Sequence, residues 1–274
     1  MSHPMSHSSL HAQTLTAGYA ERRVLDNVNL TIPAGQCTAI VGANACGKST
    51  LLRVLSRLLP PSQGQVLLDG TDIHRLPTRH LAKRLGFLPQ SPIAPDGITV
   101  LELVSRGRHP HQGLFNRWRT EDDAAVVEAL SATHMEALAD VQVDELSGGQ
   151  RQRAWIAMAL AQQTDVLLLD EPTTFLDINH QIEVLDLLTD LNHSRGTTIV
   201  MVLHELNLAA RYADTLIAMA KGNVYAMGAA AEVLTTTMVR EVFGLENRVI
   251  ADPMTGKPMM IPLGRHGGVV RGQG

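Results

Sequence analysis

The chain contains few aromatic residues, only two cysteines and no long hydrophobic run. Aromatic residues make up 3% of its 274 residues, so we expect an aliphatic core. No apolar run reaches the ~18 residues that a membrane-spanning helix needs. The polar start, MSHPMSHSSLHAQ, does not have the apolar segment of a signal peptide. These absences predict a protein that stays in the cytoplasm.

Charge and cysteine usage exclude further classes of protein. The net charge of −4 argues against a polyanion-binding surface, so we expect no nucleic-acid partner. The cysteines, Cys37 and Cys46, lie in an apolar run and in a glycine-rich segment. This setting argues against a disulfide framework and predicts two reduced thiols. The remaining composition, 45% apolar and 18% charged, is ordinary for a globular protein with a substantial core.

Apolar residues recur with two kinds of spacing along the chain. Strand-like runs alternate with helical segments near both ends, which predicts an α/β fold with a mainly parallel sheet. From about residue 91 to 160 strand-like runs are absent, and this predicts a helical subdomain inserted into the α/β core. The expected strands lie at 12–32, 37–41, 65–68, 86–88, 166–169, 198–203, 215–219 and 224–227, and the expected helices at 48–58, 99–107, 121–131, 149–162 and 229–243.

Residues 42–49 read GANACGKS and fit the phosphate-binding pattern GxxxxGK[ST]. An apolar strand pattern precedes them and a helical pattern follows, whereas a chance glycine-rich turn would have neither. Backbone N–H groups would face the phosphates, Lys48 would neutralise the β- and γ-phosphates, and Ser49 would ligate Mg²⁺. The residues expected at the nucleotide are Gly42, Asn44, Cys46, Gly47, Lys48, Ser49 and Thr50.

Residues 166–171 read VLLLDE, four aliphatic residues followed by two acids. A buried strand that ends here would place both carboxylates at the carboxyl edge of the sheet, where open α/β folds bind ligands. Asp170 is suited to hold Mg²⁺, and Glu171 is suited to polarise an attacking water. The alternative is a solvated strand end without a ligand.

A second anion site is indicated at residues 146–150, LSGGQ, which open a helical pattern. A serine followed by two glycines leaves the N–H groups of a helix start open to an anion. Because the phosphate-binding loop already holds one nucleotide, we expect this segment to contact the nucleotide of another subunit. The residues concerned are Ser147, Gly148, Gly149 and Gln150.

With these three motifs in this order, residues 10–250 resemble the ATP-binding subunit of an ABC transporter. The resemblance implies a P-loop NTPase (RecA-like) core with a mainly parallel sheet, an antiparallel β subdomain and an inserted helical subdomain. It leaves residues 1–9 and 264–274 as expected disordered tails. ATP and Mg²⁺ are the implied cofactors of an ATP-hydrolysing enzyme.

Four further residues match the family position by position. Tyr19 matches the aromatic residue that stacks on adenine, and Gln90 matches the glutamine that senses Mg²⁺ and the attacking water. Asp177 matches the D-loop, which crosses the dimer interface. His204 matches the histidine that contacts the γ-phosphate. Without the resemblance, a lone Tyr or His at such positions is more often a packing residue.

The resemblance also implies an assembly. Two copies of the chain would form a head-to-tail homodimer around two ATP molecules and drive two membrane permease subunits. A periplasmic or lipid-anchored substrate-binding protein would deliver the cargo to the permease. The expected location is the cytoplasmic face of the bacterial inner membrane, as a peripheral subunit.

Segments 44–48, 106–111 and 173–181 are similar to those of ATPases that power iron–siderophore importers, in particular ferric-catecholate importers. Importers of cobalamin, haem or metal ions share parts of these segments and stay as alternatives, as do an exporter ATPase, a soluble non-transport ABC ATPase and a regulatory nucleotide-binding module. Arg106, Arg108 and Phe115 are the expected permease contacts, with solvated loop residues as the alternative interpretation.

Overall fold

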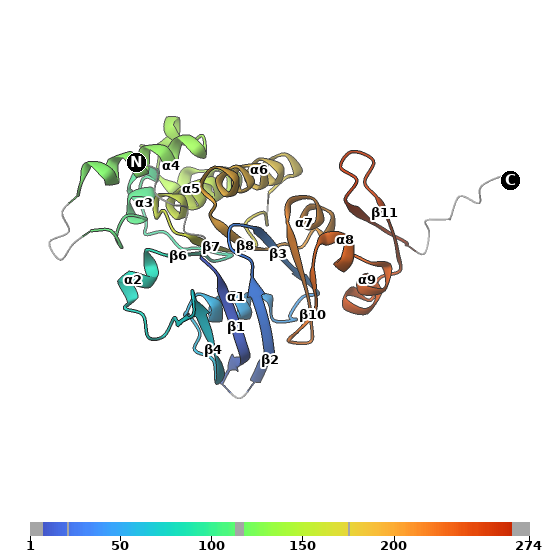
Figure 1. Ribbon diagram of the computed structural model, residues 1–274. Helices are drawn as coiled ribbons and strands as arrows, with labels where there is room; N and C mark the ends of the chain where they lie inside the picture. Colours follow the sequence, from blue (N-terminus) through green and yellow to red (C-terminus); the bar gives the residue numbers. More distant parts are fainter. Residues whose placement is uncertain (1–7, 21, 113–117, 175, 265–274) are drawn as a thin grey trace.

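A six-stranded sheet, parallel except at one edge, forms the centre of the protein. The computed structural model describes residues 8–20, 22–112, 118–174 and 176–264 (Figure 1). The strand order is β10-β9-β3-β8-β7-β6, and only β10 runs antiparallel to its neighbour. The strands are β3 (Cys37–Gly42), β6 (Leu85–Leu88), β7 (Val166–Asp170), β8 (Thr198–Val202), β9 (Thr215–Ala220) and β10 (Asn223–Gly228).

A four-stranded antiparallel sheet lies beneath the central sheet in the view of Figure 1. Helix α1 (Lys48–Leu55) packs between the two sheets, and Leu51, Leu52 and Leu55 on it are fully buried. The antiparallel strands are, in sheet order, β2 (Arg22–Ile32), β1 (Leu10–Tyr19), β4 (Gln63–Leu68) and β5 (Thr71–Asp72).

The side chains of the parallel strands point alternately to the two faces of the sheet and form two separate apolar cores. Side chains of successive strand residues point to opposite faces, so Ile40 of β3 faces α1 whereas Ala39 and Val41 belong to the core on the other face. Every residue of β3, β7 and β8 is buried. The aliphatic runs of the sequence are therefore central strands covered on both faces.

Three helices lie between β6 and β7 in the described residues and make up the inserted helical part. They are α3 (Val100–Arg106), α4 (Thr120–Ala132) and α5 (Gly148–Ala161), with short 3-10 turns at Glu136–Leu138 and Val143–Glu145. Thr99 begins α3 through a capping box with Glu102. These helices, the parallel sheet and the antiparallel sheet confirm the predicted fold class.

The C-terminal part differs from the sequence prediction at one point. Instead of one helix over 229–243 there are two, α8 (Ala230–Val233) and α9 (Thr236–Phe243), because Leu234 leaves helical geometry and the Thr235 hydroxyl caps α9 by accepting from Met238 N. The other elements are α2 (Thr78–Ala82), α6 (Ile178–Arg195), α7 (Leu206–Tyr212) and the hairpin β11 (Asn247–Ala251) with β12 (Pro258–Pro262).

Two residues expected in the N-terminal tail are held by the fold. Ser9 N donates to Asp69 Oδ1 (2.8 Å), and the buried Ser8 hydroxyl donates to Asp69 Oδ2 (3.2 Å) and Asp165 Oδ2 (3.3 Å). These hydrogen bonds link residues 8–9, which were expected in a disordered tail, to Asp69 and Asp165 of the folded part. Residues 1–7 and 265–274 lie outside the described part of the chain.

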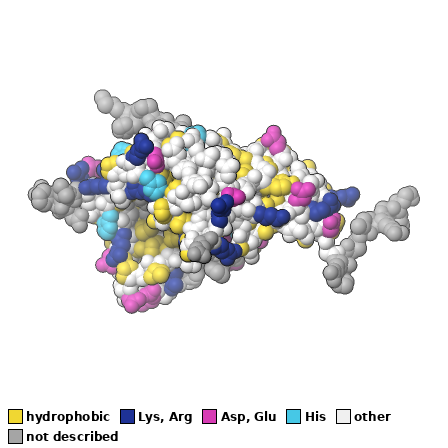
Figure 2. Space-filling view, turned by 90° about the horizontal axis from the view of Figure 1, so that it is seen from below, with side chains coloured by type: hydrophobic (Ala, Val, Ile, Leu, Met, Phe, Trp, Pro, Cys, Tyr) yellow, Lys and Arg dark blue, Asp and Glu magenta, His cyan; other side chains and the backbone are white. Residues whose placement is uncertain are grey.

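The surface mixes charges of both signs. In the view from below, Lys and Arg side chains are interspersed with those of Asp and Glu (Figure 2). None of the helices in the described ranges is long and apolar enough to cross a bilayer.

Candidate nucleotide-binding site

The loop between β3 and α1 contains two glycines at positions where a side chain would be strained. A Cβ on Gly42 would lie 2.4 Å from Met219 O and 2.7 Å from Cys46 Sγ. Gly47 has φ 107°, a backbone conformation that L side chains rarely adopt. These two glycines therefore let the chain turn sharply from the strand end into the start of α1.

The start of α1 offers free donors to an anion. Its N-cap position is Gly47, which has no side chain to accept from the first turn. The Leu51 N–H, which donates to Gly47 O (2.8 Å), makes the first intrahelical bond. Free N–H groups and the positive end of the helix dipole suit a phosphate. The buried Lys48 adds a cation, with Nζ donating to Gly42 O (2.8 Å) and Ala43 O (3.0 Å).

Ser49 and Asp170 meet at the carboxyl edge of the sheet. The Ser49 hydroxyl donates to Asp170 Oδ1 (3.0 Å) from the first turn of α1 to the end of β7. Burial raises the pKa of Asp170, and the neighbouring Glu171 carboxylate raises it further. A hydroxyl beside a carboxylate is the hard oxygen pair that Mg²⁺ prefers, so these residues fit the cation that the sequence implies.

Glu171 is held by three side chains from different segments. Its Oε2 accepts from Gln90 Nε2 (2.5 Å) and from the Thr174 hydroxyl (3.0 Å), and its Oε1 lies 2.6 Å from His204 Nε2. The residue is 9% exposed and has φ 55°. A non-glycine residue in this region costs energy and occurs mainly where the surroundings enforce it. The carboxylate is therefore fixed at one position beside the phosphate-binding loop.

Most of these groups line one cleft with a volume of about 570 Å³. Tyr19, at the end of β1, lies half-exposed at this cleft, and its hydroxyl accepts from Arg53 Nη1 (3.2 Å). Gly42, Cys46 and Asp170 are not among the described residues that line it. The lining residues are Tyr19, Arg22, Val24, Asn44, Ala45, Gly47, Lys48, Ser49, Thr50, Gln90, Glu171 and His204.

The LSGGQ segment lies apart from this cleft. Among the described residues that line the cleft, none comes from 146–150. Ser147 instead caps α5 through a capping box with Gln150, with bonds of 3.3 and 3.0 Å. A Cβ on Gly149 would lie 3.4 Å from the His180 ring, and His180 Nδ1 lies 2.8 Å from Asp177 Oδ1. The structure thus brings Asp177 close to the LSGGQ segment, at the starts of α5 and α6.

Comparisons place the chain among known proteins. The ABC transporter family profile matches residues 25–174. The chain is 54% identical over 261 residues to the probable siderophore transport system ATP-binding protein YusV of Bacillus subtilis (strain 168), a match that covers 95% of each chain. It is 53% identical over 256 residues to the ferric enterobactin transport ATP-binding protein FepC of Escherichia coli (strain K12), covering 93% and 94% of the two chains.

The chain belongs to the ABC transporter family. This ABC ATPase also resembles the dimeric structure of MJ0796, a bacterial ABC transporter cassette, with a TM-score of 0.72 and 31% identity over 80% of this chain and 98% of that one. The family profile spans the phosphate-binding loop, Gln90, the LSGGQ segment and Glu171. Tyr19, Asp177 and His204 lie outside the matched range.

One residue of the ABC ATPase was misread from its sequence. Arg108, expected to contact the permease, is 4% exposed and pairs with Asp122 inside the helical part. Its guanidinium is therefore not available to a partner. Arg106 is exposed at the end of α3, so its expected permease contact stays a prediction. Phe115 lies outside the described residues.

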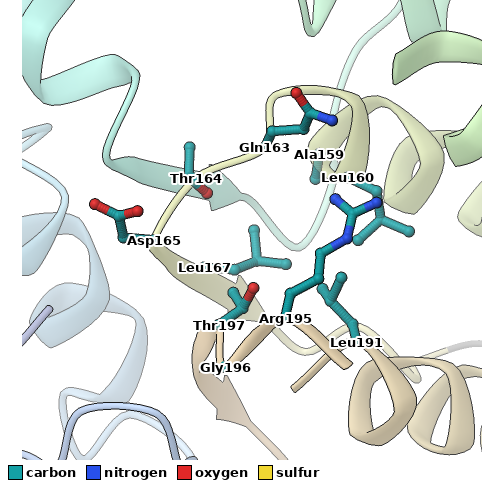
Figure 3. Close-up of a pocket in the computed structure, with 10 residues that line it drawn as sticks. All are labelled: Ala159, Leu160, Gln163, Thr164, Asp165, Leu167, Leu191, Arg195, Gly196 and Thr197. Atoms are coloured by element: carbon teal, nitrogen blue, oxygen red, sulfur yellow. The ribbon is translucent and has the colours of Figure 1, made fainter. Parts of the chain in front are cut away.

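A second cavity, of about 180 Å³, lies at the opposite edge of the sheet (Figure 3). Asp165 and Thr197 on its wall precede β7 and β8, so it lies at the amino ends of these strands, away from the edge where ligands of open α/β sheets bind. The Arg195 guanidinium at its wall pairs with Glu128 of α4. This cavity is therefore separate from the nucleotide cleft.

Outside the phosphate-binding loop, sequence reasoning missed two residues that line the cleft, Arg22 and Val24, and one residue beside it, Thr174. Thr174 donates to Glu171, and the only sequence signal is its place three residues after that acid. Arg22 and Val24 line the cleft from β2 beside Tyr19. Their strand pattern carries no sign of a ligand, because only the fold of the antiparallel sheet brings β2 over the phosphate-binding loop.

Proposed function

We propose that this ABC ATPase powers a bacterial importer of ferric siderophores. The observation that carries the proposed ATP hydrolysis is the position of Glu171, held by Gln90 and His204 at the strand edge beside the phosphate-binding loop. A carboxylate fixed there can orient a water for attack on a γ-phosphate. The site thus has the parts that ATP hydrolysis requires.

Each group in the cleft has a distinct proposed role. Tyr19 stacks on the adenine, and the N–H groups of the loop with Lys48 hold the phosphates. Ser49 and Asp170 would hold Mg²⁺, with Gln90 near it, and the cation would neutralise charge on the phosphates. Glu171 accepts a proton from the attacking water. His204 fixes the Glu171 carboxylate and reaches toward the γ-phosphate.

Two chains are proposed to share each ATP. The start of α5 offers N–H groups to an anion, yet it lies outside the cleft of its own chain. Gly148 has open space where a Cβ would stand, so a phosphate of another chain can approach. A head-to-tail dimer with two-fold symmetry would bring Ser147, Gly148, Gly149 and Gln150 of one chain to the nucleotide of its partner, with Asp177 at the same interface. The dimeric cassette noted above supports this arrangement.

The proposed cargo follows from the relatives. The two relatives described above are ATP-binding proteins of siderophore and ferric enterobactin transport and match nearly the whole chain. We propose that two permease subunits in the inner membrane carry a ferric siderophore, which a substrate-binding protein delivers. The ATPase would lie at the cytoplasmic face and never contact the cargo. Cobalamin, haem or a metal ion are the alternative cargoes.

The test combines co-purification with uptake. A tagged chain expressed with its neighbouring transport genes should bring down the permease subunits from detergent-solubilised membranes. Cells with these genes should take up a labelled ferric siderophore, and Glu171→Gln should abolish uptake without reducing co-purification. Uptake of labelled cobalamin or haem instead would reassign the cargo, whereas the absence of any membrane partner would contradict the transport role.

A further inference from the structure

The C-terminal end of α5 is held by side chains from another segment. The last turn of this helix contains no basic residue, although its final carbonyls carry the negative end of the helix dipole. Arg108 Nη1 donates to Ala161 O (2.7 Å), and the His111 ring Nε2 lies 2.8 Å from Gln162 O. The end opposite the LSGGQ segment is therefore capped by residues 107–111, here named the clasp.

Arg108 forms hydrogen bonds to three places in the helical region. Its Nε donates to Asp122 Oδ1 (2.9 Å) at the start of α4, and its Nη1 also donates to Gln163 Oε1 (3.0 Å) just after α5. Both Arg108 and Asp122 are almost fully buried, with exposures of 4% and 2%. A planar guanidinium can make these bonds at once in a fixed geometry, which a lysine cannot.

Two further contacts fix the clasp itself. A Cβ on Gly107 would lie 2.3 Å from Met158 O, so the end of α3 touches the backbone of α5 directly. Arg79 Nε of the α2 segment donates to Pro110 O (2.8 Å). Within the segment RGRHPH at 106–111, which is similar to that of siderophore-importer ATPases, most residues thus contact the end of α5 or fix the segment that does.

We propose that the clasp positions the LSGGQ end of α5 for the nucleotide of the partner chain. The helix of 14 residues is a stiff rod of about 21 Å at about 1.5 Å per residue. If the C-terminal end of α5 tilts, the whole helix tilts with it, and Ser147 and Gly148 at the other end are displaced. Arg108 and His111 act as positioning residues, and this role rests on the proposed two-chain site.

A buried ion pair can also serve stability alone, and the experiment separates the two roles. Removing one partner of such a pair leaves an uncompensated charge, whereas neutralising both is often tolerated. The double variant Arg108→Met/Asp122→Asn removes both charges, and the asparagine keeps an oxygen for the Arg119 N–H that Asp122 accepts (3.1 Å). The control is Arg195→Met, which breaks the ion pair with Glu128 and leaves the α5 carbonyls untouched.

The measurement is ATP-dependent dimerisation in sedimentation, with every variant made on a Glu171→Gln background. Because the loss of one hydrogen bond to a charged phosphate weakens binding about tenfold or more, we expect the double variant to raise the dimer dissociation constant by about that factor. Binding of a fluorescent ATP analogue to the monomer should stay unchanged, and the control should dimerise like the parent. Dimerisation of the folded double variant at the parental level would overturn the proposal.

A second pair of variants decides the question if the double variant does not fold. His111 is only partly buried, so His111→Ala leaves the core intact, and His111→Gln keeps a donor for Gln162 O. Weaker dimerisation of the alanine variant, restored by glutamine, supports the clasp, and equal dimerisation of His111→Ala and the parent contradicts it. A parent that does not dimerise in ATP refutes the two-chain site itself, which is a different failure.

Discussion

His204 Nε2 lies 2.6 Å from Oε1 of Glu171 and so joins the ends of the neighbouring strands β8 and β7. Glu171 directly follows β7, and His204 lies two residues after the end of β8, both at the carboxyl edge of the parallel sheet. The contact leaves the second carboxylate oxygen to Gln90 and Thr174. The position of the proposed general base is thus set by side chains from three separate segments.

Replacing Glu171 by Gln should nearly abolish ATP turnover. The amide keeps the shape of the side chain and one of the two oxygens that accept hydrogen bonds. It cannot take a proton from water. General-base catalysis contributes about 10²-fold to 10⁴-fold, so the turnover number should fall by about that factor. Steady-state ATPase kinetics measure this, with Glu183→Gln on the exposed part of α6 as the control. Turnover at the native rate would show that another group activates the water.

Loss of the His204 imidazole should lower the turnover number more than it changes the KM for ATP. His204→Ala frees one oxygen of Glu171 and removes a group near the γ-phosphate, so we expect a fall of about 10-fold to 10²-fold from misplacement. The control is His193→Ala, an exposed residue near the end of α6. A changed KM at native turnover would instead assign His204 to ATP binding alone.

Lys48→Ala should weaken ATP binding itself. Lys48 is the cation of the phosphate-binding loop, and its loss removes charge-assisted bonds to the phosphates. Titration with a fluorescent ATP analogue should show a markedly raised dissociation constant, whereas Lys83→Ala on the exposed surface should bind like the native chain. An unchanged affinity would contradict the assignment of the loop.

Cys37 should make the free energy of unfolding depend on alkaline pH. Burial, aided by the Asp214 carboxylate, raises the pKa of Cys37 to about 12 from its ordinary value of 9.0. Between these values the unfolded thiol loses its proton while the folded one keeps it, so stability falls as pH rises above about 9. Urea unfolding from pH 8 to 11 should show a shallower decline for Cys37→Ala. Parallel curves for the two proteins would refute this.

Features set by short stretches of sequence were predictable. The strand, glycine loop and helix around Lys48 follow one another within a few residues, so their spacing alone indicates the phosphate-binding loop. The aliphatic run before Asp170 likewise predicts a central strand with acids at its carboxyl edge. These local patterns are sufficient for the fold class and for most of the cleft.

Features set by contacts between distant segments were not predictable. Arg108 looks like a surface arginine in the sequence, and only the packing of α4 and α5 against its loop buries it beside Asp122. Thr174 could not be assigned to Glu171 without the turn that follows β7. The break at Leu234 was missed because the Thr235 cap interrupts an apolar spacing that otherwise continues.

The central claim is that one chain's LSGGQ segment completes its partner's ATP site. The direct measurement mixes two inactive variants, Lys48→Ala and Gly148→Asp. A Cβ on Gly148 has nothing within 4 Å, and an acid at a helix start is tolerated, yet its charge repels a phosphate. Half of the randomly mixed dimers contain both variants, and each of these keeps one intact site of two.

Mixing should therefore restore about a quarter of native ATPase activity if the dimer is head-to-tail. Each variant alone should stay inactive, because every site in its homodimer has one damaged half. Activity in the mixture no higher than in the separate variants would contradict the account, since it would mean that each chain completes its own site.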